Sequence, residues 1–276
     1  MNRFSIAAVL AAATGLAAGT VSAQDWTGGY IGLSAGGNTT HHHGDGIAFD
    51  TNLDGNYGDT VPNGSGGDAF SAGACSGNAQ GRMPSDGCTK NKHKANVGLR
   101  AGYDWRMNDI VYGVVGEVDS VKIEDSVSAF SSEPNAYTFS RKVKTLSALR
   151  GRVGYASNDW LTYATAGFVW ADVRHEFATT NNLNTFTAGD SKSHGGYQVG
   201  LGVEKSMGGA WRVGLEYLHT SLRDPSPVVR AGPSPSTFAS NLFLATNPQG
   251  TDMKRGSDRF RNDSVLVTVI YRFGAR

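Results

Sequence analysis

The chain contains 276 residues, with 25 basic and 24 acidic side chains and a formal net charge of +1 at pH 7. This balance excludes the basic excess of a nucleic-acid-binding protein and the acidic excess of a disordered solvating chain. Glycine accounts for 37 residues, about twice its usual share, and it is spread along the chain without a collagen period.

The first 23 residues have the pattern of a secretory signal peptide. Met1-Asn2-Arg3 is a short basic start, residues 4–18 are apolar and rich in alanine, and residues 21–23 (Val-Ser-Ala) form a small-residue cleavage box. We expect cleavage before Gln24, so that residues 24–276 form one exported β domain. The alternative is an N-terminal anchor or core helix, for which this apolar run is short.

The rest of the chain repeatedly alternates large apolar residues with polar or small ones. In the closing stretch, for example, every second residue from Val265 to Phe273 is valine or aromatic. Such period-2 alternation predicts strands. We expect eight strands, near residues 27–38, 94–105, 110–119, 146–155, 160–170, 197–204, 211–217 and 263–273.

Short and long connections alternate strictly between these strands. The short ones lie near 106–109, 157–159 and 207–209, and the long ones near 39–93, 125–140, 177–193 and 223–258. This order predicts an all-β fold, an eight-stranded antiparallel up-and-down transmembrane β-barrel with long extracellular loops. Both chain termini then fall on the short-turn side, as expected of a protein that reaches the outer membrane from the periplasm.

Aromatic residues recur on the outward face of several strands, beside a short turn or the C-terminus. Aromatic rings prefer the boundary between lipid tails and headgroups. We therefore predict a periplasmic aromatic girdle that consists of Trp105, Tyr155, Trp160, Trp211, Tyr271 and Phe273.

The opposite face of the strands carries charged residues together with glycines. A soluble barrel or sandwich is the alternative, but its solvated face does not need small residues, whereas a narrow lumen does. The glycines on this face are Gly98, Gly102, Gly113, Gly154, Gly200, Gly202 and Gly214. The predicted lumen charge network consists of Arg100, Glu117, Asp119, Arg150, Arg152, Glu204, Arg212, Glu216 and Arg272.

Inward charges must pair, because an unpaired buried charge is costly. The expected register across 207–209 sets Glu204 opposite Arg212. A second expected cluster joins Arg150 and Arg152 to the carboxylates on the preceding strand, Glu117 and Asp119. Such a network either plugs the lumen and fixes strand register, which we favour, or forms a gated ion path or substrate site.

Several strand motifs resemble the small porin-like outer-membrane β-barrel proteins of Gram-negative bacteria, related to the OmpA transmembrane domain. They are the segments at 26–32 (WTGGYIG), 149–155 (LRGRVGY), 159–163 (DWLTY), 200–204 (GLGVE), 215–217 (LEY) and 271–273 (YRF). The resemblance implies a β-barrel fold, an outer-membrane location and recognition of the C-terminal strand by the barrel-assembly machinery. Two departures are Val115-Gly116-Glu117, where the family often carries Glu-Gly-Asp, and the three residues that follow Phe273.

The predicted loops contain three features of their own. Cys75 and Cys88 predict one local disulfide in an oxidising compartment. His41–His43 and the segment 54–59 (Asp-Gly-Asn-Tyr-Gly-Asp) have weak metal-binding character, but a solvated polar loop is the favoured interpretation. The proline-rich loop 223–258 also contains Val228, Val229, Phe238, Leu242, Phe243 and Leu244, which either pack over the barrel mouth or meet a partner.

His219-Thr220-Ser221 resembles the His-x-Ser pattern of lipid A deacylases, but no glutamate follows Glu216 to orient the histidine. We therefore expect no enzymatic activity and no cofactor. The first hypothesis is a structural and surface-interaction protein with a plugged lumen and exposed loops; the alternative is a small diffusion channel for ions or small solutes. The expected partners are outer-membrane lipid, lipopolysaccharide and the assembly machinery, without nucleic acid.

Overall fold

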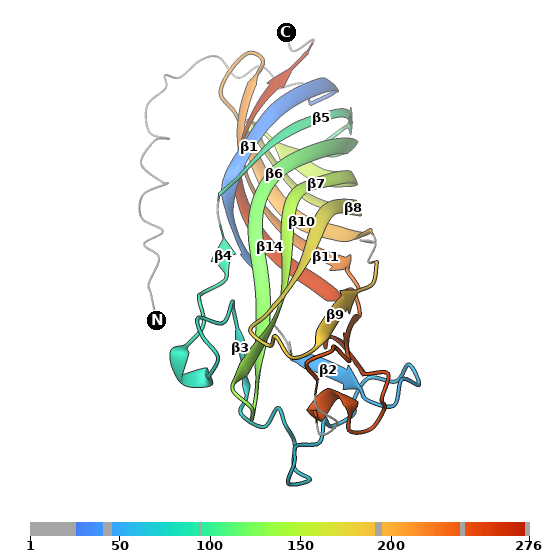
Figure 1. Cartoon of the computed structure of the whole chain (residues 1–276). Helices are drawn as coiled ribbons and strands as arrows, with labels where there is room; N and C mark the ends of the chain where they lie inside the picture. Colours follow the sequence, from blue (N-terminus) through green and yellow to red (C-terminus); the bar gives the residue numbers. More distant parts are fainter. Residues whose placement is uncertain (1–25, 41–45, 94, 191–194, 238–240, 274–276) are drawn as a thin grey trace.

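The computed structural model of the protein describes residues 26–40, 46–93, 95–190, 195–237 and 241–273. The predicted signal peptide, His41–His43 and the last three residues lie outside these ranges. Eight long strands form the main body (Figure 1). They are β1 (Gly28–Thr40), β5 (Asn96–Met107), β6 (Ile110–Ser131), β7 (Asn135–Ser157), β8 (Trp160–Thr179), β10 (Gly196–Ser206), β11 (Trp211–Arg223) and β14 (Arg259–Arg272).

These strands form a closed antiparallel barrel. The sheet runs in the order β6-β5-β1-β14-β11-β10-β8-β7, and pairing of β7 with β6 completes the ring. The first and last strands meet, with Tyr30 opposite Arg272 and Gly37 opposite Val265. Each of the other six barrel strands pairs with the barrel strands that precede and follow it in the chain. The predicted eight-stranded up-and-down barrel is therefore confirmed.

Three short turns connect strands at one end of the barrel, which also holds the C-terminal end of β14. Asn108 and Asn158 have positive φ angles of 58° and 52°, a conformation that asparagine tolerates better than most residues. Gly208 and Gly209, in the third turn, have φ angles of 93° and 56°. Each short turn therefore contains residues suited to the left-handed backbone of a tight hairpin. We call this the short-turn end.

The barrel has an inside-out distribution of polarity. Leu99 and Leu201 point outward and are 66% and 65% exposed, whereas Arg150 and Glu216 point inward and are each 1% exposed. Because successive side chains on a strand face opposite sides, a single alternation produces both surfaces. An apolar outer wall around a charged interior is the arrangement expected in a bilayer.

At the opposite, long-loop end the chain builds a second, four-stranded antiparallel sheet (Figure 1). Its order is β2-β13-β12-β9, and 3-10 helix η4 (Leu242–Leu244) packs beside it. We call this sheet, η4 and the adjoining tips of β6 and β7 the cap. The strands of the cap sheet are β2 (Ile47–Asp50), β9 (Thr185–Ala188), β12 (Val229–Gly232) and β13 (Thr251–Arg255).

Two short strands and one 3-10 helix, β3 (Ala74–Ser76), η3 (Pro84–Asp86) and β4 (Lys92–His93), complete the first long connection. Both strands pair with the part of β6 that extends past Asn96, the residue at which β5 begins. Within the described ranges, no helix is long and apolar enough to cross a membrane.

The expectation of a long loop at 125–140 is wrong. Strand β6 continues to Ser131 and β7 begins at Asn135, so only residues 132–134 form the turn. Residues 125–131 are all buried, although Ser126 and Ser128 are polar. Their hydroxyls are satisfied inside the structure, where Ser128 Oγ donates to the Gly77 carbonyl at 2.7 Å. Polar and apolar residues do alternate in this extension, but only over short runs, 126–129 (Ser-Val-Ser-Ala) and 137–140 (Tyr-Thr-Phe-Ser), so the strand signal is weaker than in the barrel wall.

Candidate functional site

The centre of the barrel lumen contains an alternating set of two guanidinium and two carboxylate groups from four strands. Arg100 Nη2 lies 2.7 Å from Glu117 Oε1 and 2.6 Å from Glu216 Oε2. Arg150 also pairs with Glu117, and its Nη1 lies 3.7 Å from Glu216 Oε1. All four residues are at most 4% exposed, so each charge depends on its neighbours for solvation.

A second cluster lies closer to the short-turn end and is organised by Asp104. The Asp104 carboxylate pairs with both Arg152 and Arg272, and Arg152 Nη1 lies 2.6 Å from Glu204 Oε1. The predicted lumen charge network did not include Asp104, although Asp104 lies four residues after Arg100 and faces the same side of the strand. The alternation of side chains along β5 is therefore the sequence signal that places Asp104 in the lumen.

The expected Glu204–Arg212 pair is wrong. In the structure Glu204 lies opposite Gly214, and Arg212 lies opposite Ser206. The turn spans residues 207–210, which shifts the register from the expected one. Arg212 instead donates to the carbonyl groups of Gly209 and Trp211, at 2.8 and 2.9 Å, while Glu204 pairs with Arg152 across the lumen.

Asp119 and Arg152 also differ from the expected cluster. Asp119 accepts a hydrogen bond from Ser34 Oγ at 3.4 Å, and within the described part of the chain no ion pair reaches it. Arg152 is directed toward Asp104 and Glu204 instead. The structure thus joins Arg150 to Glu117 but separates the other two members of the expected cluster.

Aromatic rings fill the space between the two ion clusters. The Arg152 guanidinium lies 4.8 Å from the centre of the Tyr30 ring and 4.9 Å from that of Tyr163. A Cβ atom on Gly102 would overlap the Tyr30 ring, and one on Gly202 would overlap the Tyr163 ring. The lumen glycines therefore leave room for the two rings that pack against Arg152 of the second cluster.

A third ion cluster, not expected from the sequence, joins the barrel to the cap. Arg141 Nε and Arg255 Nη2 lie 2.6 and 3.1 Å from Asp125 Oδ2. Asp224 accepts from Arg141 at 3.5 Å, and its Oδ1 lies 3.1 Å from His175 Nε2. The five residues come from β6, β7, β8, β13 and the segment after β11. We call them the rim cluster, because they tie the cap sheet to the wall of the barrel.

The cap has its own aromatic core. The ring centre of Phe243, which is fully buried, lies 5.4 Å from that of Tyr137 and 6.1 Å from that of Phe70. Burial raises the pKa of Tyr137 to about 12. Of the apolar residues in the proline-rich loop, Val229, Leu242 and Phe243 belong to this core, and Phe238 lies outside the described ranges. Its buried members are Phe49, Val61, Ala69, Val127, Tyr137, Phe139, Val229, Ala231, Leu242, Phe243 and Met253.

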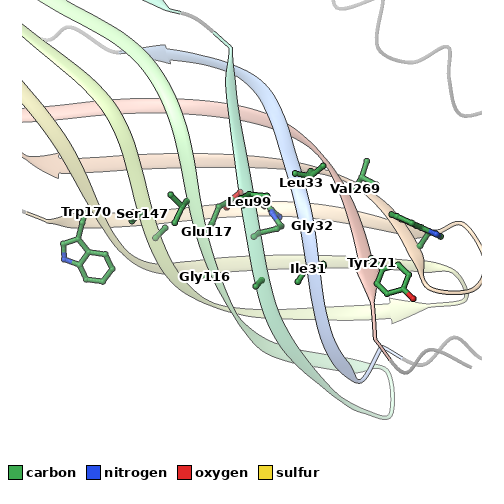
Figure 2. Close-up of a pocket in the computed structure, with 15 residues that line it drawn as sticks. Ile31, Gly32, Leu33, Leu99, Gly116, Glu117, Ser147, Trp170, Val269 and Tyr271 are labelled. Atoms are coloured by element: carbon green, nitrogen blue, oxygen red, sulfur yellow. Dashed lines mark hydrogen bonds and ion pairs between the residues drawn. The ribbon is translucent and has the colours of Figure 1, made fainter.

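The outer wall is apolar and aromatic at the short-turn end. The six predicted girdle residues are each 37–55% exposed, and neighbouring rings contact one another, as Trp211 and Tyr271 do at 5.2 Å. A shallow apolar depression of about 790 Å³ crosses the wall between Trp170 and Trp211 (Figure 2). Its outward lining, which includes Leu33 and Leu99, is suited to contact with acyl chains.

The disulfide between Cys75 and Cys88 is present, with a Cα–Cα distance of 6.5 Å. Cys75 is on β3 and pairs with Ser128 of β6. The closed loop packs against the β6–β7 extension, where Ser140 Oγ donates to Asn78 Oδ1 at 3.0 Å. The disulfide therefore restrains the 75–88 loop, which contacts the extended parts of β6 and β7.

In the acidic loop that begins at Asp50, the carboxylates accept hydrogen bonds from backbone amides of the same loop. Asp50 accepts from the amides of Asp54 and Gly55 at 3.2 and 2.8 Å, and Asp54 Oδ1 accepts from the amide of Asn56 at 2.8 Å. The latter bond lowers the pKa of Asp54. Among the residues whose placement is described, no three His, Cys, Asp or Glu side chains are arranged to hold a metal ion.

His219 has an acidic partner, which is an aspartate rather than the downstream glutamate of the deacylase pattern. His219 Nδ1 lies 2.7 Å from Asp263 Oδ1 on the neighbouring strand. Ser221 is only 5% exposed, and no hydrogen bond joins it to His219 among the described contacts. Among the described contacts, His219 and Ser221 therefore do not form the nucleophile–base pair of a hydrolase, and the His219–Asp263 pair links β11 to β14.

Comparison with known proteins supports the barrel from independent sequences. A family model described as an outer membrane protein beta-barrel domain matches residues 8–273. The 31 kDa outer-membrane immunogenic protein of Brucella melitensis is 30% identical over 129 residues, 45% of this chain and 52% of that protein. The 22 kDa outer membrane protein of Rhizobium leguminosarum bv. viciae is 38% identical over 119 residues, 43% of this chain and 48% of that protein. The chain thus matches about half the length of these curated relatives.

Two solved structures resemble the chain more distantly. The outer membrane protein OprG of Pseudomonas aeruginosa has a TM-score of 0.49 and 12% identity, covering 90% of this chain and 98% of that chain. The attachment invasion locus protein Ail of Yersinia pestis, solved with the heparin analogue sucrose octasulfate, has a TM-score of 0.34 and 11% identity, covering 89% and 99%. Neither likeness carries an argument about function.

Proposed function

Because the chain belongs to the outer-membrane β-barrel protein family, we propose that it is a surface-interaction protein whose barrel anchors a folded cap outside the cell. The observation that carries this proposal is the buried core shared by the external segments. Loops that served only to connect strands would not need a core of phenylalanine and tyrosine rings. A folded cap presents a fixed surface, which reduces the entropy that a partner must overcome on binding.

The charge network supports an anchoring barrel over an open pore. An eight-stranded barrel is just wide enough for its own side chains. Here two ion clusters and the rings of Tyr30 and Tyr163 occupy the interior. Removing one partner from a buried ion pair typically costs about 3–5 kcal/mol, so the network resists rearrangement. The proposed role of these side chains is to plug the lumen and hold strand register.

A small diffusion channel for ions or small solutes is the second candidate. The observation that favours it is a group of buried polar atoms without a described hydrogen-bond partner. They include Tyr30 OH, Tyr163 OH and Gln198 Oε1. Buried polar atoms of this kind are commonly satisfied by water, and a continuous line of waters would conduct ions weakly.

Single-channel recording of the refolded protein in planar bilayers separates these candidates. The plugged barrel predicts only small, infrequent current steps. A Glu117→Ala variant, which leaves Arg100 and Arg150 with only Glu216 as a described carboxylate partner, should then give more frequent openings. Steady nanosiemens-scale steps from the unaltered protein would overturn the plugged lumen and establish the channel.

We also propose that the signal peptide is removed on export, that assembly machinery engages β14, and that the cap faces the outside. The name of the Brucella relative, an immunogenic outer-membrane protein, supports an exposed surface. Cysteine variants at two exposed serines test this orientation: Ser65 in the first long connection and Ser157 beside a short turn. In intact cells an impermeant maleimide should label Ser65→Cys, whereas Ser157→Cys should react only after the outer membrane is permeabilised. The reverse result would contradict the proposed orientation.

A further inference from the structure

The outer wall changes from apolar to charged at the same level on β6 and β8, the two strands that flank β7. On β6 the outward residue Val118 is followed by Ser120 and then Lys122. On β8 the outward Trp170, which projects from the wall in Figure 2, is followed by Asp172 and Arg174. Tryptophan prefers the interface between acyl chains and headgroups. The level just beyond Trp170 therefore corresponds to lipid headgroups on the cap side of the membrane.

A β-bulge interrupts the wall at this level. Between the pairs Ser120–Thr145 and Ile123–Val143, two residues of β6 face the single residue Lys144 of β7. A bulge of this kind re-aims side chains and bends the strand. Val143 is buried whereas Lys144 is exposed and Thr145 is partly exposed. The bulge thus turns Lys144 onto the outer face beside Lys122, at the edge of a depression of about 540 Å³.

Two of the three lysines that line this depression have no described acidic partner. Lys142 faces Glu124 across the strand pair, and its Nζ lies 2.6 Å from Glu176 Oε2. Within the described residues, no ion pair or hydrogen bond involves the side chain of Lys122 or Lys144. Two exposed ammonium groups therefore border a depression directly above the apolar wall.

We propose that this depression binds a phosphate group of lipopolysaccharide, the phosphorylated lipid of the outer leaflet. The inference rests on the proposed orientation, in which the cap and the bulge face outward. Ammonium groups attract phosphate, and their position above Trp170 allows the same lipid to place an acyl chain on the apolar wall. A membrane-embedded phosphate fits better than a soluble anion, because the site borders the apolar wall.

Binding of lipid A to the full-length protein in phosphatidylcholine nanodiscs tests the site. A juxtamembrane lysine strengthens binding to an anionic lipid by about five-fold, so Lys122→Gln with Lys144→Gln should weaken binding about 25-fold. Lys205→Gln is the matched control, because Lys205 packs over Trp160 near the short-turn end. The affinity of the Lys205→Gln variant for lipid A should stay within two-fold of that of the unaltered protein.

Two further arms identify the ligand chemistry. Lipid A without phosphates should bind the unaltered protein as weakly as lipid A binds the double variant, and inorganic phosphate should not compete. Equal binding by the double variant and the unaltered protein would overturn the site, and competition by inorganic phosphate would identify a free anion instead. Reversed maleimide labelling would instead contradict the orientation, so failure of the proposed function can be told from failure of this site.

Discussion

Replacing Phe243 by alanine should unfold the cap while leaving the barrel closed. Phe243 is fully buried, and its ring centre lies within 6.5 Å of those of Phe70, Tyr137 and Phe186. Truncating a buried phenylalanine to alanine typically costs about 3–5 kcal/mol. The cap sheet consists of strands of four or five residues, so its local stability is small beside that of the barrel. The loss should therefore appear as local opening.

Limited trypsin digestion of the refolded protein measures this opening. Arg230 and Lys254 lie on paired cap strands, and their peptide bonds should become rapidly cleavable in the Phe243→Ala variant. Heat-modifiable gel migration should be unchanged, because the barrel strands remain paired. Phe168→Ala is the control, because Phe168 is 68% exposed on the outer wall and lies outside the cap core. Equal digestion of the Phe243→Ala variant and the unaltered protein would refute the idea that the external segments share a cooperative core.

Three other predictions concern the lumen, the disulfide and the cap tyrosine. Gly202→Val should destabilise the barrel by about 1–3 kcal/mol, because the added side chain overlaps the Tyr163 ring. Gly37→Ala should be neutral, because no atom lies close to the added Cβ. The temperature at which the folded gel band disappears measures both effects. Cys75→Ser should remove up to about 3 kcal/mol from the first long connection, seen as faster proteolysis of residues 74–91 with the barrel band intact. The pKa of Tyr137 is raised from 10.0 to about 12, so the neutral phenol contributes about 2–3 kcal/mol to the free energy of unfolding. This contribution is present below pH 10 and is lost as the pH rises toward about 12. Near-ultraviolet circular dichroism should show cap loosening over that range, and Tyr137→Phe should lose this pH dependence.

The sequence by itself determined the barrel and its polarity. Alternation along a strand is a local property, because neighbouring side chains always face opposite sides. Parity therefore separated outward residues such as Leu201 from inward ones such as Glu216 without knowledge of strand pairing. The alternation of long and short connections then implied the up-and-down order, which needs only the positions of the turns.

The tertiary structure alone decided which charges meet and what the external segments form. Glu204 pairs with Arg152 rather than Arg212, because register and barrel closure bring together strands that are distant in sequence. The strand extension around Ser128 is buried on both faces, and polar and apolar residues alternate there only over runs of about four residues, so its period-2 signal is weak. The cap core collects short segments from several connections, and each is too short to show a pattern before the barrel brings them to one end. Local geometry therefore specifies which side a residue faces, whereas its partner depends on packing across the whole molecule.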